Sequence, residues 1–390
     1  MRDRYIIKHI RLYGEEGFSE PNELALMISK EKIEDICPEG TETPEGWETM
    51  DGEGAYVIPG LIDCHNHLAL DVELPGYLER MNHSETELAM IAFRTLQKDL
   101  ASGVTTSRCM GDRNYLDVFC KNAIKNGMLE GPELFVAGIG MKASHGHGYV
   151  GLPFDGEDEL IRAVRKNVFH GADWIKYFST ASTPMADRKR IQSFYSEGEI
   201  AAVINEAHRS GKKVTSHCIG GEALQNSVKH GIDCVEHIYF ADEADIETLL
   251  AHHTPVCLTP TEYFADNENA PAGYHSNMVS YRQEVRANME RAIAAGIPFV
   301  LGTDGSHGKL WLEASLAVEF GAKPEEVLKA ATERAARLLG IDQHTGKIQK
   351  GYDADLVLLK GNPLENIENL REVKAVYKKG ALVTAAKKED

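Results

Sequence analysis

Six residues spread along the chain have side chains and positions that suit binding of metal ions. His65 and His67 are separated by one residue and stand at the end of the apolar run 57–62. Because side chains alternate along a strand, both imidazoles are expected to project in the same direction and to bind one ion together. The other candidates end or interrupt short apolar runs further along the chain: Lys176, His217, His237 and Asp304.

Each candidate taken alone also has an ordinary structural interpretation. A single histidine can be a satisfied core residue, and Asp304 in Gly-Thr-Asp-Gly can cap a turn. A lysine can extend its amine to the surface, yet Lys176 lies within Trp-Ile-Lys-Tyr-Phe at 174–178, where a buried ammonium is costly. The joint placement of all six residues therefore favours a metal site.

The order of the secondary-structure elements explains how these residues meet. Between residues 57 and 305, short apolar runs alternate with stretches of helical periodicity, expected at 85–101, 155–170, 196–210, 221–230, 242–252 and 280–295. The predicted strands end at His67, Ser107, Gly140, Phe178, His217, His237, Thr259 and Asp304. Eight such repeats over about 250 residues predict an α/β fold of the (β/α)8 TIM-barrel type, with an open doubly wound sheet as the alternative. In a barrel the strand ends converge on one face.

The two ends of the chain have a different pattern. Residues 1–56 and 345–390 contain short strand-like runs such as 24–28, 355–359 and 373–377, with turns between them. We predict that both termini together build a small β-sandwich domain, and that residues 57–344 form the barrel.

Composition limits the classes of partner. A formal net charge of −18 argues against nucleic acid, whose phosphates require a basic face. The 7 cysteines are dispersed, without a CxxC pair, as in reduced cytoplasmic proteins. No apolar run approaches the length of a membrane span or signal peptide. We therefore expect a cytoplasmic protein with a small-molecule or short-peptide substrate and no membrane or nucleic-acid partner; a homo-oligomer is left open.

The ordered set of His-x-His, Lys, His, His and Asp resembles the metal-dependent amidohydrolase superfamily in its binuclear form with a carboxylated lysine. The resemblance extends from Pro-Gly-Leu-Ile-Asp-Cys-His-Asn-His at 59–67 to the tail segment 346–357. It implies that two divalent metal ions share one site, held by His65, His67 and Asp304 on one side and by His217 and His237 on the other. Lys176 is then expected to bridge both ions as a CO2-derived carbamate.

The resemblance also implies a mechanism and a metal. A metal-bridging hydroxide is expected to attack an amide carbonyl, while Asp304 takes the proton and passes it to the leaving nitrogen. Zinc suits a mixture of imidazole and oxygen ligands best, with manganese, cobalt and iron as alternatives.

Within the superfamily, the chain most resembles the group that contains imidazolonepropionase and the Xaa-Pro dipeptidase or carboxypeptidase-like enzymes. Lys176 favours the peptide-cleaving branch, because imidazolonepropionase and the deaminases lack the bridging lysine. The expected substrate is a small peptide or an N-acyl amino acid. A cyclic amide, carbamate, urea or ester is the alternative on the same centre, and a catalytically silent scaffold is a third possibility.

Substrate contacts are expected from three places. His145 and His147 lie in a glycine-rich segment after the third strand, for which a flexible loop is the alternative, and Tyr239 follows the sixth strand. Arg188 and Arg190 are weaker candidates for carboxylate recognition.

The loops around the expected site depart from the family pattern. Ala-Ser at 143–144 and the run 178–182 lack the paired glycines common in the peptidase branch, which alters how closely backbone can approach a ligand. The segment 261–277 lacks strong periodicity and is expected to be a long loop that can act as a lid.

Overall fold

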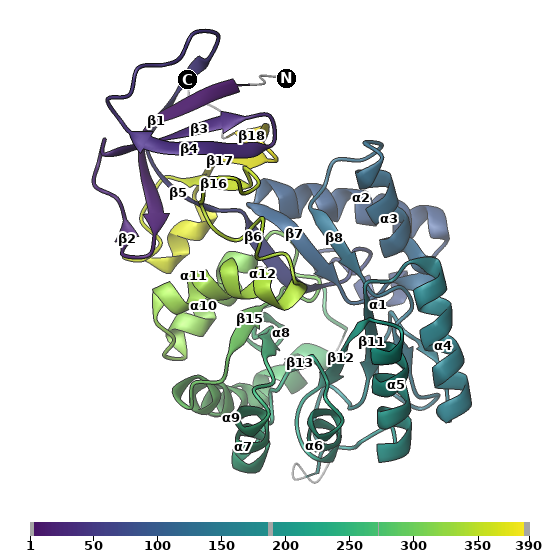
Figure 1. Ribbon diagram of the computed structural model, residues 1–390. Helices are drawn as coiled ribbons and strands as arrows, with labels where there is room; N and C mark the ends of the chain where they lie inside the picture. The colour runs from purple at the N-terminus through teal and green to yellow at the C-terminus, as the bar shows by residue number, and fades with distance from the viewer. Residues whose placement is uncertain (1–3, 186–189, 272, 386–390) are drawn as a thin grey trace.

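A barrel of parallel strands occupies the centre of the computed structural model, which describes residues 4–185, 190–271 and 273–385. Its strands follow one another in chain order (Figure 1): β6 (Leu61–Asn66), β7 (Val104–Cys109), β8 (Glu133–Val136), β11 (Trp174–Phe178), β12 (Lys213–Cys218), β13 (Cys234–His237), β14 (Val256–Leu258) and β15 (Phe299–Leu301). Two further short strands, β9 (Met141–Lys142) and β10 (Leu152–Pro153), extend the connection after β8.

Two hydrogen bonds close the ring of strands. Strands β6 to β8 pair in parallel, and so do β11 to β15. The amide of Asp173 donates to the carbonyl of Val136 at 2.8 Å and joins β8 to β11, and the amide of Asp304 donates to the carbonyl of His65 at 2.8 Å and joins β15 to β6. The predicted (β/α)8 barrel is therefore confirmed, and the open sheet is excluded.

Helices surround the barrel (Figure 1). Their bounds are α1 (Tyr77–Arg80), α2 (Glu85–Ala101), α3 (Leu116–Lys125), α4 (Glu157–His170), α5 (Glu197–Arg209), α6 (Glu222–Lys229), α7 (Glu243–Ala251), α8 (Thr261–Phe264), α9 (Tyr274–Ala294), α10 (Leu310–Glu319), α11 (Pro324–Ala330) and α12 (Glu333–Leu339). Capping boxes begin α2 and α5, where the Ser84 and Ser196 side chains accept from the amides of Glu87 and Glu199. The helix predicted at 85–101 matches α2 at both ends.

The loop predicted at 261–277 is wrong at both ends. Helix α8 occupies its start, and α9 begins at Tyr274, six residues before the predicted 280. The buried stripe of α9 already includes Met278 and Tyr281, while Gly273 takes a left-handed conformation at the N-cap. Pro271 and Gly273 hide this start in the sequence. Among the described residues, 265–271 and Gly273 lie between the two helices.

The strands near both termini form one separate sheet beside the barrel (Figure 1). It comprises β1 (Arg4–Gly14), β2 (Gly17–Phe18), β3 (Leu24–Ser29), β4 (Lys32–Pro38), β5 (Glu48–Pro59), β16 (Leu356–Leu359), β17 (Val373–Lys378) and β18 (Ala381–Ala385). The rings of Tyr5 and Tyr377 are 6.0 Å apart although β5 and β16 lie between their strands in the sheet order. The sheet therefore folds over on itself around an apolar interior.

The boundary between the two parts differs slightly from the prediction. Val57 and Ile58 pair with β16 in the small sheet, so β5 runs past residue 56 to Pro59 before the barrel begins at Leu61. The division into 1–56 plus 345–390 and 57–344 otherwise stays a prediction.

Two features relate to the predicted compartment of the protein: the state of its cysteines and the character of its helices. All seven cysteines are buried and free. Across residues 4–185, 190–271 and 273–385, no helix has both the length and the apolar character needed to cross a membrane.

Candidate metal centre

The structure brings the six predicted ligand residues together at the C-terminal ends of the barrel strands. They line a cavity with a volume of about 320 Å3. The six are His65, His67, Lys176, His217, His237 and Asp304. Segments separated by more than two hundred residues thus supply one site, as expected of a barrel.

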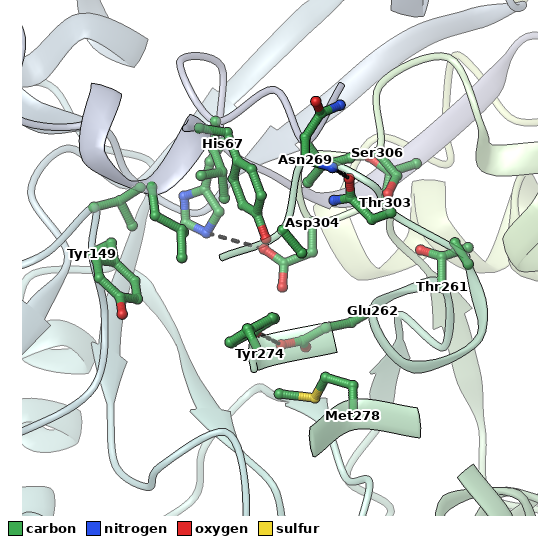
Figure 2. Close-up of a pocket in the computed structure, with 18 of the residues that line it drawn as sticks. His67, Tyr149, Thr261, Glu262, Asn269, Tyr274, Met278, Thr303, Asp304 and Ser306 are labelled. Carbon is green, nitrogen blue, oxygen red and sulfur yellow. Dashed lines mark hydrogen bonds and ion pairs between the residues drawn. The ribbon is translucent and has the colours of Figure 1, made fainter. Parts of the chain in front are cut away.

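The carboxylate of Asp304 lies at the centre of the imidazoles. Its Oδ1 is 3.3 Å from Nε2 of His65 and 3.5 Å from Nε2 of His67. Its Oδ2 is 4.0 Å from Nε2 of His237. His65, His237 and Asp304 each offer a ligand atom within 4.8 Å of the others, a spacing that suits metal ligands. Figure 2 shows Asp304 between His67 and Glu262, with the His67 contact as a dashed line.

Lys176 is the most unusual group of the site. Its Nζ is buried and has no hydrogen-bond partner among the described residues, and it lies 4.9 Å from the centre of the Phe178 ring. Burial lowers the pKa of Lys176 to about 8, against the opposing effect of the nearby carboxylates. The Nε2 atom of His65 is also buried without a hydrogen-bond partner. Two such atoms facing one cavity fit a site that holds divalent cations.

Hydrogen bonds to the outer ring nitrogens orient two further imidazoles. Nδ1 of His67 lies 2.6 Å from the carbonyl oxygen of Gly111. Nδ1 of His237 lies 2.7 Å from Oγ1 of Thr259. Both contacts leave Nε2 directed at Asp304, an arrangement typical of ligands to a metal. Burial lowers the pKa of His67 to about 3, which keeps its ring neutral.

His217 has the opposite orientation. Its Nε2 lies 3.2 Å from the carbonyl oxygen of Ala181, so Nδ1 is the nitrogen left for a metal. Its ring centre is 4.5 Å from that of His237. Burial lowers the pKa of His217 well below its ordinary value. The neutral ring is the form that binds metals.

A buried network beneath His65 has no counterpart in our sequence analysis. Oε2 of Glu236 lies 2.7 Å from Nδ1 of His65, and its Oε1 accepts from the Arg108 guanidinium at 2.7 Å. The Thr215 hydroxyl also donates to Oε1, and Arg108 stacks 4.6 Å above the Trp174 ring. Burial raises the pKa of Glu236, but the positive charge of Arg108 reverses this and holds it well below its ordinary value.

The backbone is strained at two of the site residues. His237 has a φ of 83° and Asp304 a φ of 46°, values uncommon for residues other than glycine. Such conformations cluster at functional sites, where the surrounding structure enforces them. Here they direct the side chains at the ends of β13 and β15 into the cavity.

Gly302 permits the close approach of β15 to His65. A side-chain Cβ at Gly302 would lie 2.6 Å from the backbone nitrogen of His65 and would also collide with its Cβ. We expect Gly302→Ala to lower the free energy of unfolding by about 1–3 kcal/mol in urea titrations, because the barrel must shift to admit the methyl group. Gly40→Ala is the control, because no atom lies within 4 Å of its added Cβ. Equal stabilities of both variants would contradict this role.

Of the three residues predicted to contact the substrate, one lines the cavity and two do not. His147 lines the cavity, and its ring centre is 4.6 Å from that of His217. His145 is exposed and packs against Phe194 instead, because a tight turn at 143–146 directs it outward. Tyr239 is fully buried behind the cavity wall. Direct contact of His145 or Tyr239 with a ligand in the cavity is therefore not supported.

Neither arginine candidate gains support. Arg190 is exposed and does not line the cavity. Arg188 lies outside the described residues.

A second group on the cavity wall was missed by the sequence analysis. Oε2 of Glu262 accepts from the Tyr239 hydroxyl at 2.9 Å, and Oε1 accepts from the Tyr274 hydroxyl at 2.8 Å. The Tyr239 hydroxyl also lies 2.6 Å from Oγ1 of Thr259. Glu262 and Tyr274 both line the cavity. One sequence signal could have identified Glu262: it is a carboxylate three residues after Thr259, the predicted end of a barrel strand.

Fold and site together define a hydrolase that belongs to the amidohydrolase family, whose sequence model, described as "Amidohydrolase family", matches residues 56–383. Members of this family generally use divalent metal ions, in agreement with the ligand groups found here. The predicted resemblance to the amidohydrolase superfamily is therefore confirmed.

Particular relatives support the same assignment. An ochratoxinase of Aspergillus niger is 27% identical over 401 residues, covering 92% of this chain and 82% of the relative. An imidazolonepropionase of Vibrio cholerae is 22% identical over 391 residues, covering 88% of this chain and 89% of the relative. The crystal structure of a Xaa-Pro dipeptidase with bound methionine has a TM-score of 0.85 and 25% identity, covering 98% of this chain and 100% of that one.

Proposed function

We propose that the protein is a binuclear metal-dependent hydrolase that cleaves the amide bond of a small peptide or N-acyl amino acid. The observation that carries the proposal is the convergence of the six candidate ligands on one cavity, where the buried Nζ of Lys176 has no hydrogen-bond partner among the described residues. We assign one ion to His65, His67 and Asp304, and the other to His217 and His237. Zinc suits these donors best.

Lys176 is proposed to carry CO2 as a carbamate. Its buried amine has a lowered pKa, so a neutral Nζ is available to add to CO2 with release of a proton. The product replaces a positive charge, costly beside histidine rings, with a negative charge that two cations balance. Its oxygens would hold both ions.

When bound, the two ions supply polarisation of the scissile carbonyl and a lowered pKa of the attacking water. Asp304 is proposed to accept the proton of that water and to donate it to the leaving nitrogen. Burial raises the pKa of Asp304, but the neighbouring His65 holds it well below its ordinary value, so the carboxylate is ionised. His147 is proposed to donate a hydrogen bond to the carbonyl oxygen as charge develops there.

The size of the cavity favours a small substrate. A volume of about 320 Å3 is at the lower end of ligand pockets in proteins. Its wall combines apolar groups such as Leu70, Val72 and Met278 with the polar groups of the site. Likeness to a Xaa-Pro dipeptidase over the whole chain supports a dipeptide. We propose a Xaa-Pro dipeptidase or carboxypeptidase-like activity.

A substrate library tests this proposal. Protein of measured metal content is incubated with dipeptides, including Xaa-Pro members, with N-acyl amino acids, and with lactams, carbamates, ureas and esters. We expect turnover among the dipeptides or N-acyl amino acids. Hydrolysis confined to lactams, carbamates, ureas or esters would instead assign the alternative substrate class to the same centre, and inactivity of metal-loaded protein throughout would overturn the proposed function.

Removal of metal is expected to abolish activity. Dialysis against a chelator should reduce turnover at least about a hundredfold, because the ions supply both the polarised carbonyl and the activated water. Zinc added together with bicarbonate should restore it more completely than zinc alone, since bicarbonate supplies CO2 for Lys176. Activity that survives measured loss of metal would contradict the prediction.

A further inference from the structure

Glu262 differs from Glu73 and Asp266, two other acidic side chains around the cavity, in the partners that it has. Glu73 is paired with Lys98 at 2.7 Å and with Lys309 at 2.9 Å. Asp266 is paired with Arg282 at 2.9 Å. Among the described residues, no lysine, arginine or histidine forms an ion pair with Glu262, whose hydrogen-bond donors are the two neutral phenols of Tyr239 and Tyr274.

The phenols hold Glu262 in place without neutralising it. Each carboxylate oxygen accepts one hydroxyl, and an ionised carboxylate has about four acceptor positions, so further positions stay free. Tyr239 is fully buried, and Tyr274 belongs to the first turn of α9. The carboxylate, itself in α8, is therefore held by two hydrogen bonds from ordered elements, which suits specific recognition.

A positive charge beside Glu262 would stabilise its ionised form. Burial raises the pKa of Glu262 to about 7, and the negative charge of Asp304 adds to the effect. A cation placed against Glu262 would offset both the lost hydration and this repulsion. Figure 2 shows Glu262 on the side of Asp304 opposite His67. A substrate can therefore touch Glu262 at one end while its scissile bond lies at Asp304.

We propose that Glu262 is a specificity-determining residue that binds a positively charged nitrogen group of the substrate, a protonated amine or a guanidinium. This inference rests on the proposed function, since it concerns which amides enter the same site. Two sources have this chemistry, the free α-amine of a peptide and a basic side chain. The hydrogen-bonded path from Glu262 through Tyr239 and Thr259 to His237 fixes the position of the bound charge relative to the metal site.

Binding measurements test the inference independently of turnover. Titration calorimetry with metal-loaded protein compares matched ligands that differ in one charge: L-lysine with L-norleucine, L-arginine with L-citrulline, and L-leucine with N-acetyl-L-leucine. We expect the charged member of at least one pair to bind at least about tenfold more tightly than its neutral counterpart. The lysine and arginine pairs report a basic side chain, and the leucine pair reports the α-amine.

The variant Glu262→Gln should reduce this preference to about twofold or less while binding of the neutral members changes little. Glu284→Gln is the matched control, because Glu284 is exposed on α9 and outside the cavity. Tyr274→Phe keeps the carboxylate but removes one phenol, and should lower the preference by a smaller factor. Circular dichroism and metal content verify that each variant is folded and loaded.

The outcomes separate the two proposals. Equal binding of charged and neutral ligands to the unaltered protein, or a preference that survives in Glu262→Gln, would overturn the role of Glu262. If Glu262→Gln does not fold, an unchanged preference in Tyr274→Phe overturns it. A Glu262-dependent preference in a protein that hydrolyses none of the library would support this inference and reject the proposed function.

Discussion

Replacement of Asp304 with Asn is expected to lower kcat by about a thousandfold while KM changes by less than about threefold. Proton transfer by a positioned side chain contributes about 10²–10⁴ in rate, and an amide neither accepts the proton of the water nor protonates the leaving nitrogen. Oδ1 of Asp304 lies 3.3 Å from Nε2 of His65 and 3.5 Å from Nε2 of His67, at the C-terminal ends of the barrel strands. Steady-state kinetics on the best substrate of the library measures both constants.

The controls for this variant address loss of metal and loss of structure. Metal content is determined on the same preparation, because Asp304 is also proposed as a ligand and a demetallated variant is inactive for another reason. His145→Asn serves as the matched substitution near the site, since His145 is exposed and outside the cavity. An Asp304→Asn variant with normal metal content and near-normal kcat would refute the proton-transfer role.

Truncation of Glu236 to Ala is expected to lower the free energy of unfolding by about 3–5 kcal/mol, the cost of leaving a charge buried without its partner. Arg108 is fully buried and pairs with Glu236 at 2.7 Å, so its guanidinium loses that partner. His65 loses the hydrogen bond to its Nδ1 as well. Urea unfolding followed by circular dichroism gives the change in stability.

A surface carboxylate provides the comparison for Glu236. Glu197 is exposed and pairs with Lys229 at 2.6 Å, so Glu197→Ala should leave the unfolding midpoint nearly unchanged. Double substitution of Glu236 and Arg108 by apolar residues should recover part of the loss, because no unpaired charge then stays buried. Equal midpoints for Glu236→Ala and Glu197→Ala would show that the buried pair does not support the fold.

The strand ends of the barrel could be predicted because parallel strands in a βα fold have a strong local pattern. Apolar runs such as 174–178 and 299–301 are buried strands in the structure, and the candidate ligands stand within them or beside their C-terminal ends. The barrel then makes these distant positions neighbours. Two things therefore predict that His65, Lys176 and Asp304 meet at one cavity: the apolar pattern of each strand, and the rule that the C-terminal ends of barrel strands share one face.

Partners of the ligands could not be predicted in the same way. Arg108 and Glu236 are on β7 and β13, and nothing local in either strand says that their charges meet beneath His65. Glu262 likewise depends on a phenol from α9, whose first turn follows the proline and glycine signals of a loop. Pairing across elements depends on tertiary distance, which the pattern of a single strand or helix does not contain.

The histidines at 145 and 147 show how loop geometry decides which of two side chains reaches the cavity. They are two residues apart and have the same side chain, yet His147 lines the cavity while His145 is exposed. The turn in which Gly146 donates to the carbonyl of Ala143 separates them. Spacing identifies such a pair as candidates, and backbone geometry selects between them.

Metal content per chain, measured by inductively coupled plasma mass spectrometry, distinguishes a binuclear site from a mononuclear one. We expect about two equivalents of divalent metal in protein loaded with zinc and bicarbonate, because five of the candidate ligands are proposed to bind two ions and Lys176 is proposed to bridge them. Lys176→Ala should retain about one equivalent or less, since the bridge between the two ions is lost. One equivalent or none in the unaltered protein, or two in the Lys176→Ala variant, would contradict the binuclear site.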